Sequence, residues 1–405
     1  MTWRRTRLKY LAEVPIRNGL GEAGAYDDPS WPRYVRTTDI ADARNLRSDV
    51  FKSLPPSVAA KASLRHGDLL LSAAGTIGKS YLHSGSSPAC FAGYLVRFRP
   101  RSDIDPRFVA YWTESRPYWD QIQAGAVRST IENFSAGKFQ NLVLDVPPLD
   151  EQRRVADFLD AETSRMDRVR VARSRMQELL RLKRERVIEH LIGDQRNAHQ
   201  LIPLKHLVDS VSVGIVITPA AWYVESDGVP ALRGINVKPG RIDDKDLVQI
   251  SHEGHLVHRK SRLKAGDLVV VRTGQAGAAA VVTPEFDGAN CIDLVIVRPG
   301  PFLAPRFAEY LLNSSYAKRR VAEFAVGSIQ SHFNVAAMKA MPVPRKSPAD
   351  QKRIVSEIDR AIEPIEKSVV EMQKQDELLV ERRQAIITAA VTGQIDVTTA
   401  RGMDV

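Results

Sequence analysis

The chain has 405 residues, and its hydrophobic fraction of 43% is ordinary for proteins that build globular cores. Its formal net charge of +10 favours a polyanionic partner, with nucleic acid ahead of a membrane, because no basic block lies beside an apolar span. No stretch approaches the roughly 18 apolar residues of a membrane helix, and the first residues lack the apolar segment of a secretory signal. These features predict a cytoplasmic protein with no membrane partner.

The first 149 residues contain short apolar runs separated by Gly, Pro, Ser and Asp, a pattern that predicts strands joined by turns. A helix is expected over residues 105–121, where Pro106 suits the first helical turn. Residues 150–195 follow, with apolar positions spaced alternately four and three apart. This spacing is the pattern of a coiled-coil helix.

The same order of elements recurs in the second half of the chain. Residues 196–348 predict a second globular domain with a helix over residues 304–324, and residues 349–392 predict a second long helix. Pro364 should kink this helix or end it early, because proline cannot donate the helical hydrogen bond. Residues 393–405 remain as a C-terminal tail.

Each long helix carries one apolar seam, which polar residues such as Arg173 and Gln375 interrupt. The first seam follows Val155, Leu159, Met166, Val169, Met176 and Leu180, and the second follows Ile354, Ile358, Ala361, Ile365, Met372 and Leu379. A single seam on each helix is most simply buried against the other helix of the same chain. Pairing with a helix of another chain is the alternative.

A repeat accounts for this organisation. The segment Leu64–Leu71 recurs in similar form as Leu263–Val270, an offset of 199 residues between Leu64 and Leu263. So long an offset indicates a duplicated domain rather than a solenoid, whose repeats run to tens of residues. Each copy has one cysteine, Cys90 or Cys291, and we expect a buried thiol in each copy rather than a disulfide.

The duplication also predicts how the long helices pair. Two helices that leave their own domains in the same way are most simply related by a pseudo-two-fold axis, which makes them antiparallel. The expected fold class is therefore α+β, with two duplicated mixed α/β domains separated by two long helices that form an antiparallel coiled coil. Roughly 40 residues at 1.5 Å per residue give a stiff spacer of about 60 Å.

Three segments carry a resemblance to a known family. They are the glycine-containing run of residues 64–80, the helix start at residues 146–154, and the helix end at residues 381–396. With the duplication and the paired helices, they make the chain similar to the specificity subunit of a Type I restriction–modification enzyme over essentially its full length. The second copy departs at residues 347–351, where Asp350 keeps the negative charge that suits a helix start.

The resemblance implies that residues 1–149 and 196–348 are target-recognition domains, each reading one half of a split double-stranded DNA sequence. The helices would set the spacing and dock methyltransferase subunits, two in number, and restriction subunits would join the assembly. It also implies that this chain binds no cofactor, because S-adenosylmethionine, ATP and Mg²⁺ belong on the partner subunits. Duplicated basic modules on a rigid spacer independently fit two half-sites at a fixed separation.

No constellation in the sequence predicts catalysis or metal binding by this chain. Residues 73–80 fit a relaxed Walker A pattern, but the residues after Lys79 and Ser80 cannot sustain the helix that a P-loop requires. The second copy has also lost the lysine and serine, so we predict a glycine-rich turn that can contact the DNA backbone. The histidine triplet at residues 252–258 lacks a cysteine or a convergent carboxylate, and a solvated loop is the simpler interpretation.

DNA contacts are expected from polar and basic residues in loops where the two copies differ. Arginine suits guanine edges, asparagine and glutamine suit adenine, and lysine mostly meets phosphate. For any one residue, a solvent-facing side chain without a DNA contact is the alternative. The candidates are Arg36, Thr37, Thr38, Lys79, Arg128, Ser129 and Thr130 in the first copy, and Arg233, Asn236, Arg272, Thr273, Gln275, Ser328, Gln330 and His332 in the second.

Three rival functions remain open at this stage. A P-loop NTPase would hydrolyse nucleotide on its own, and an interaction scaffold or antitoxin-like coiled-coil protein would bind DNA only through bulk charge. The third alternative is a specificity subunit of a combined restriction–methylation enzyme outside Type I. Only the neighbouring genes would distinguish it from a Type I subunit. The recognised DNA sequence does not follow from the residues, because base readout depends on loop geometry and DNA deformability.

Overall fold

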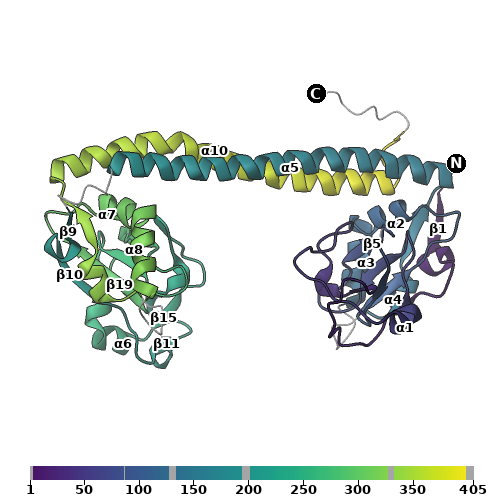
Figure 1. Cartoon of the computed structure of the whole chain (residues 1–405), viewed down its shortest axis with the longest axis horizontal. Helices are drawn as coiled ribbons and strands as arrows, with labels where there is room; N and C mark the ends of the chain where they lie inside the picture. The colour runs from purple at the N-terminus through teal and green to yellow at the C-terminus, as the bar shows by residue number, and fades with distance from the viewer. Residues whose placement is uncertain (1–2, 86, 127–133, 194–200, 327–332, 398–405) are drawn as a thin grey trace. The chain divides into compact units, whose positions relative to one another are not determined.

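The chain forms two compact units, each of which joins a globular part to segments of both long helices (Figure 1). The computed structural model describes residues 3–85, 87–126, 134–193, 201–326 and 333–397. The first unit contains Met1–Ser174 and Gln373–Val405, and the second contains Arg175–Met372.

The first unit is built around a four-stranded antiparallel sheet in the order β2-β7-β4-β5. Both central strands are buried on both faces, which explains why their apolar residues run consecutively instead of alternating. Leu69 and Leu71 face one core and Leu70 faces another. The strands of this unit are β1 (Arg4–Arg7), β2 (Arg17–Asn18), β3 (Arg33–Val35), β4 (Leu69–Ser72), β5 (Ser80–Leu82), β6 (Ala89–Phe91), β7 (Leu95–Phe98) and β8 (Val143–Val146).

Two smaller pairings complete the strands of this unit. Strands β1 and β8 are antiparallel, and β3 and β6 are parallel. The short helices of the globular part are α1 (Pro56–Ala59), α2 (Pro106–Trp112), α3 (Arg116–Ala126) and α4 (Ala136–Gln140). The largest core joins α2, α3, α4 and the sheet to Val155 and Leu159 of α5 (Leu149–Ile192) and to Ile387 of α10 (Pro348–Val391).

The second unit repeats the main pairings and adds strands. Its antiparallel sheet has the order β10-β19-β16-β17, and β9 pairs with β20. The parallel pair β12-β18 lies within a four-stranded sheet of order β11-β15-β12-β18, and β13 pairs with β14. The strands are β9 (Leu201–Pro203), β10 (Val208–Val213), β11 (Tyr223–Val224), β12 (Val229–Leu232), β13 (Val237–Lys238), β14 (Arg241–Ile242), β15 (Val248–Ile250), β16 (Leu268–Val271), β17 (Ala279–Val281), β18 (Asn290–Cys291), β19 (Leu294–Pro299) and β20 (Pro342–Pro344). The helices are α6 (His252–Val257), α7 (Pro305–Leu312), α8 (Ser315–Val326) and α9 (Val335–Ala340).

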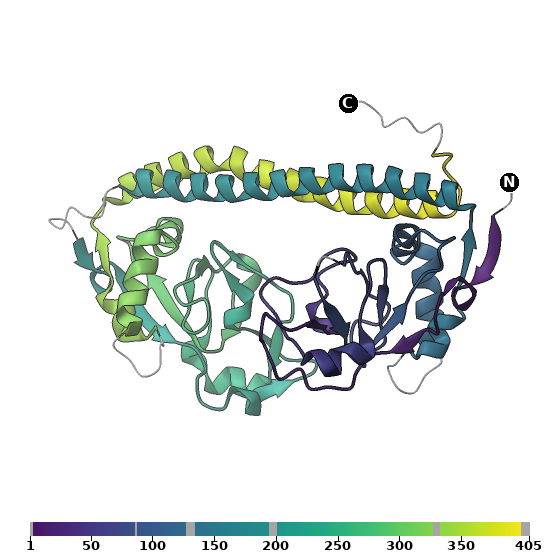
Figure 2. The same ribbon diagram turned by 45° about the vertical axis from the view of Figure 1, so that its right-hand side comes forward.

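The two long helices run antiparallel within each unit, and Figures 1 and 2 both draw them side by side. In the first unit, Arg173 of α5 pairs with Asp376 of α10 at 3.2 Å. In the second, Arg184 pairs with Glu366 at 3.0 Å. The predicted α+β class and antiparallel pairing are confirmed. Within the described residues, no helix is both long enough and apolar enough to cross a membrane.

The start of each long helix is fixed by a buried glutamine. Gln152 donates to the carbonyl of Pro147 at 2.8 Å and accepts from the N–H of Asp105 at 2.8 Å. Its counterpart Gln351 donates to the carbonyl of Lys346 at 3.0 Å and accepts from the N–H of Ala304 at 2.7 Å. The recurrence of these contacts shows that both copies attach to their helix by the same hydrogen bonds.

The single helices expected over residues 105–121 and 304–324 are each broken into two. Polar side chains at the breaks bond to the preceding turn, in competition with the helical backbone. Ser115 donates to the carbonyl of Trp112, and Ser314 donates to that of Leu311, both at 2.6 Å. The N–H of Arg116, at the start of α3, instead donates to the hydroxyl of Thr388 on α10.

The early end expected at Pro364 does not occur, because α10 continues to Val391. Ile362 and Ile365 on either side of the proline are 1% and 6% exposed. Burial of these side chains offsets the hydrogen bond that proline cannot donate.

The predicted helix seam is correct only towards the ends of each helix. Val155, Leu159 and Ile358 are buried against the globular cores, whereas Val169 and Met176 are 38% and 47% exposed. The apolar seam residues near the helix ends therefore pack largely against the globular parts, whereas the heptad pattern predicts that they pack against the opposite helix.

Candidate nucleic-acid interface

The first unit contains an open cavity of about 690 Å³ at the edge of its globular part. One wall is the segment after β3, which includes the 3-10 turn Thr37–Asp39, and the other is the turn between β4 and β5. The lining combines hydroxyl groups, two cationic side chains and an aromatic ring, groups that can contact phosphates and base edges. The lining residues are Thr37, Thr38, Ile40, Ala41, Arg47, Ala74, Gly75, Thr76, Lys79 and Tyr94.

Three of the predicted contact residues, Thr37, Thr38 and Lys79, therefore lie together in this cavity. Lys79 donates from Nζ to the carbonyl of Ile40 at 2.6 Å and so braces one wall against the other. The lysine ammonium has two further protons to offer. The hydroxyl oxygen of Thr37 is buried and has no hydrogen-bond partner among the described residues.

The Walker-like segment is a tight turn between two strands. Gly75 and Gly78 have φ of 73° and 86°, in the left-handed region that glycine favours. The N–H groups of Gly78 and Lys79 bond to the carbonyls of Ser72 and Thr76, and Ser80 begins β5 rather than a helix. The second copy makes the same turn through Gly274 and Gly277. No helix start follows the lysine to bind nucleotide phosphates.

Arg36 and its counterpart Arg233 fold back on their own loops. Arg36 forms an ion pair with buried Asp39 at 2.7 Å, and its own N–H donates to the same carboxylate. Arg233 donates from Nη2 to the carbonyl of Asp246 at 2.6 Å, and its N–H donates to the side chain of Asn236. Arg36 thus holds the cavity wall in place, and Arg233 holds the corresponding loop of the second unit.

The second-copy candidate Asn236 is only 1% exposed. Its amide donates to the carbonyls of Asp243 and Lys245, so it fixes a loop and is not presented to a base in this conformation. Asn236 occupies the position of Asp39, which explains its burial. The sequence alone suggested that Asn236 is an exposed loop residue, because asparagine and aspartate both occur frequently in exposed turns.

The remaining second-copy candidates in the described residues lie near the glycine turn. Arg272 is paired with Asp293 at 2.5 Å, and Thr273 bonds to the same carboxylate at 3.4 Å. Gln275 is exposed. Six candidates lie outside the described residues: Arg128, Ser129, Thr130, Ser328, Gln330 and His332.

Two cavity residues were missed from the sequence. Tyr94 is 67% exposed although it is a large aromatic side chain, and Arg47 also lines the cavity and pairs with Asp49 at 2.6 Å. The exposure of Tyr94 could have been predicted from the sequence, because Gly93 and Tyr94 separate two apolar runs. This pattern is typical of a turn whose residues are exposed to solvent.

The histidine triplet and the two cysteines lie in structured parts of the second and first copies. His252 and His255 lie on α6 rather than on the predicted loop, and His255 is bonded to Asn290. The part of the chain that the structure describes has no cluster of three His, Cys, Asp or Glu residues able to hold a metal. Both cysteines are free and buried, as expected, and burial raises the pKa of Cys90 to about 12. Its thiol therefore remains protonated at neutral pH.

Residues 57–167 match the family described as the Type I restriction modification DNA specificity domain. This range contains the β4–β5 turn, Tyr94 and the start of α5. The specificity subunit of the Type I restriction enzyme StySPI from Salmonella potsdam is 25% identical over 180 residues, 43% of this chain and 38% of that protein. The EcoBI specificity subunit from Escherichia coli is 22% identical over 280 residues, 62% of this chain and 59% of that protein.

The chain is similar to Type I specificity subunits, and residues 57–167 match their DNA specificity domain. The alignments span less than two thirds of the length of either relative. A solved structure concerned with complex assembly and conformational transition of the type I R-M system matches this chain with a TM-score of 0.74 at 17% identity. The match covers 97% of this chain and 98% of that one, and it shows that the two share one fold.

We expect Lys79→Ala to leave ATP hydrolysis unimpaired per DNA-bound complex when the chain is assembled with methyltransferase and restriction subunits. Loss of the bond to Ile40 should loosen the cavity wall and weaken DNA binding at one half-site only. The measurement is the ATPase rate at saturating DNA for wild type and variant. A collapse of that rate with DNA occupancy preserved would restore the P-loop hypothesis.

Proposed function

We propose that this chain is a non-catalytic subunit that reads a bipartite double-stranded DNA sequence and directs methyltransferase and restriction subunits to it. The observation that supports it most directly is the repetition of one globular fold, attached in both copies to a long helix by the same glutamine hydrogen bonds. A repeated reader fits a target of two half-sites. The net charge of +10 fits a DNA partner, and the proposed location of a chain that reads cellular DNA is the cytoplasm.

The first-unit cavity is the proposed contact of one half-site. Lys79, Arg47 and the exposed ring of Tyr94 supply charge and stacking surface, and Thr37 and Thr38 supply hydroxyl groups. In the second unit the corresponding contacts are assigned to the residues around Gln275 and Thr273. The two surfaces differ in residue type, as two different half-site sequences require.

The long helices are the proposed spacer and docking element. Each spans 44 residues, which is about 66 Å at 1.5 Å per residue. Both also expose apolar side chains that the chain itself does not cover, such as Leu179 at 60% and Leu378 at 62%. Exposed apolar residues on an otherwise polar helix favour a protein partner, and two methyltransferase subunits are the proposed occupants.

Chemistry is assigned to the partner subunits. S-adenosylmethionine, ATP and Mg²⁺ would be bound there, while the present chain supplies sequence recognition. A specificity subunit of a combined restriction–methylation enzyme outside Type I would use the same readout, and the genes beside this one would distinguish the two cases.

The test is selection of DNA from a randomised library by this chain assembled with its methyltransferase subunits. We expect two short specified half-sites separated by a gap of fixed length and unspecified sequence. Enrichment of no sequence, with binding that depends only on salt, would instead identify a scaffold that binds DNA through bulk charge. Nucleotide hydrolysis by the isolated chain would support the NTPase alternative.

A further inference from the structure

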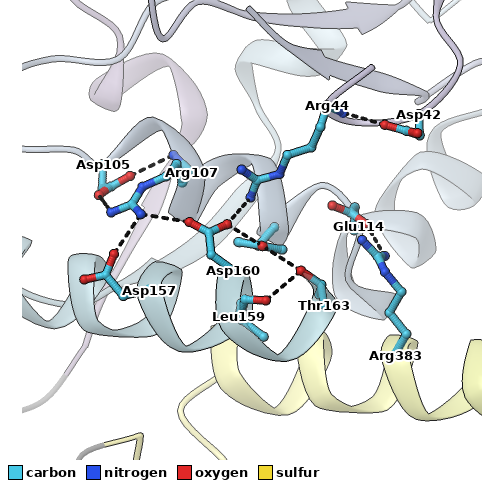
Figure 3. Close-up of polar contacts among 11 residues, drawn as sticks. Asp42, Arg44, Asp105, Arg107, Glu114, Asp157, Leu159, Asp160, Thr163 and Arg383 are labelled. Carbon is cyan, nitrogen blue, oxygen red and sulfur yellow. Dashed lines mark hydrogen bonds and ion pairs between the residues drawn. The ribbon is translucent and has the colours of Figure 1, made fainter. Parts of the chain in front are cut away.

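An aspartate on the first long helix joins three elements of the first unit. Asp160 of α5 accepts from the hydroxyl of Tyr111 at 2.7 Å and from Arg107 at 2.8 Å, and Arg44 lies 2.9 Å from the same carboxylate (Figure 3). Burial raises the pKa of the Tyr111 phenol, which therefore stays protonated as a donor.

Two of these three contacts recur in the second unit. Asp359 accepts from the hydroxyl of Tyr310 and lies 3.5 Å from Arg306. Tyrosine and arginine therefore belong to the attachment that both copies share. The loop that carries Arg44 differs in the second copy. Ile40 bridges to Leu46 across five residues, whereas Val237 pairs with Ile242 across four, and the ion pair of Asp359 is with Arg306.

Arg44 is held by stacking as well as by charge. Its guanidinium lies over the ring of Tyr111, 4.5 Å from the centroid, and its side chain is 33% exposed. The loop around it is ordered by Asp42, whose carboxylate accepts from the N–H groups of Arg44 and Asn45 at 2.8 Å each. In Figure 3, Arg44 extends from this loop to α5.

This loop continues directly from the cavity wall. The carbonyl of Ile40 accepts from Lys79, and Ile40 forms a β-bridge with Leu46. The carbonyl of Ala43 accepts from the N–H of Leu82 on β5 at 2.8 Å. The wall is thus braced by Lys79 on the cavity side and by Arg44 on the side of the long helix.

We propose that Arg44 is a positioning residue for recognition of the first half-site, acting through its contact with Asp160 and Tyr111 to fix the cavity wall to α5. The inference rests on the proposed function and adds an asymmetry to it. Reading of one half-site depends on a contact between a loop and the long helix, and reading of the other half-site does not.

The test uses the full chain assembled with its methyltransferase subunits, with Arg44→Ala, Asp160→Asn and the double variant. Affinity is measured for the selected DNA and for DNA with either half-site scrambled. We expect each single variant to lose about 3- to 10-fold in discrimination at the first half-site, identified as the one affected by Lys79→Ala. The double variant should lose little more than one single variant, because the two residues act as a pair.

The matched control is Arg101→Ala, which removes an exposed ion pair with Asp103 in the same globular part, outside the cavity lining. It should leave both half-sites unchanged. Thermal unfolding of every variant is recorded, and Tyr111→Phe, which keeps the ring under Arg44, gives a milder variant if Asp160→Asn fails to fold.

Two outcomes would overturn the proposal. If Arg44 contacts phosphate directly, Arg44→Ala weakens binding to every sequence with a shallower salt dependence, and Asp160→Asn strengthens binding by releasing the arginine. If both half-sites lose discrimination equally, the contact stabilises the subunit as a whole. Failure of the proposed function differs from both, because the wild-type assembly would then select no sequence.

Discussion

Replacing residues 1–149 with the matching segment of a Type I specificity subunit should exchange one half of the recognised sequence and leave the other half unchanged. The sheet, the cavity and helices α2 to α4 all lie within this segment. The replaced segment meets the retained helix through Gln152, whose partners in the globular part are backbone groups that any donor of the same fold supplies. It also meets Asp160 through the side chains of Arg107 and Tyr111, so the donor should keep arginine and tyrosine at these positions.

The graft must also match the apolar contacts of the junction. Val155 and Leu159 of α5 and Ile387 of α10 belong to the same core as Phe108 and Leu69. A donor with smaller side chains there would leave a cavity that costs about 2–5 kcal/mol for each large-to-small change. Donors should therefore be chosen for apolar residues of similar volume at these positions.

The measurement is selection of DNA from a randomised library by the wild-type and exchanged assemblies. Exchange of residues 196–348 is the reciprocal control and should alter only the opposite half-site. If either exchange changed both half-sites in a folded assembly, the two globular parts would be coupled and the account of two independent readers would be wrong.

The fold was predictable from the sequence because the same pattern of elements occurs in both copies of the duplication. Buried strands such as β4 and β16 keep the same apolar runs in both copies, and the turns after them keep glycines with left-handed φ. These features depend on local sequence, which is what pattern analysis detects. The breaks after α2 and α7 escaped prediction because they depend on serines that bond back to the helix and on contacts with the long helices.

The candidate site was predictable only in part. Lys79, Thr37 and Thr38 were found because they are polar loop residues, and the structure brings them to one cavity. Asn236 is also a polar residue in a predicted loop, but its side chain is buried, because the orientation of a loop side chain depends on tertiary contacts. The pairing of Arg44 with Asp160 joins positions more than a hundred residues apart, and no local sequence pattern predicts this contact.

Deleting one heptad from each long helix, Arg173–Leu179 from α5 and Met372–Leu378 from α10, should shorten the gap between the two half-sites. The segments are matched, because Arg173 pairs with Gln375 and Asp376 across the two helices. Neither segment contributes a residue to the hydrophobic cores, and Met176 and Leu378 within them are exposed. Both globular parts should therefore keep their stability.

Removing seven residues shortens a helix by about 10 Å at 1.5 Å per residue. At about 3.4 Å per base pair, the preferred gap should fall by about three base pairs with both half-sites unchanged. Three base pairs also rotate one half-site by about a third of a turn, so affinity should fall unless the helices or the DNA twist to compensate.

Deleting the heptad from α5 alone is the informative control for this experiment, because it shortens one helix only and removes the contacts of Arg173 with Gln375 and Asp376. That variant should assemble poorly and select no defined gap, whereas the matched deletion should select a shorter one. The double substitution Arg173→Ala with Asp376→Ala keeps both helix lengths and should keep the original gap. A matched deletion that folds, binds its methyltransferase subunits and still selects the original gap would show that the length of the helices does not set the spacing of the half-sites.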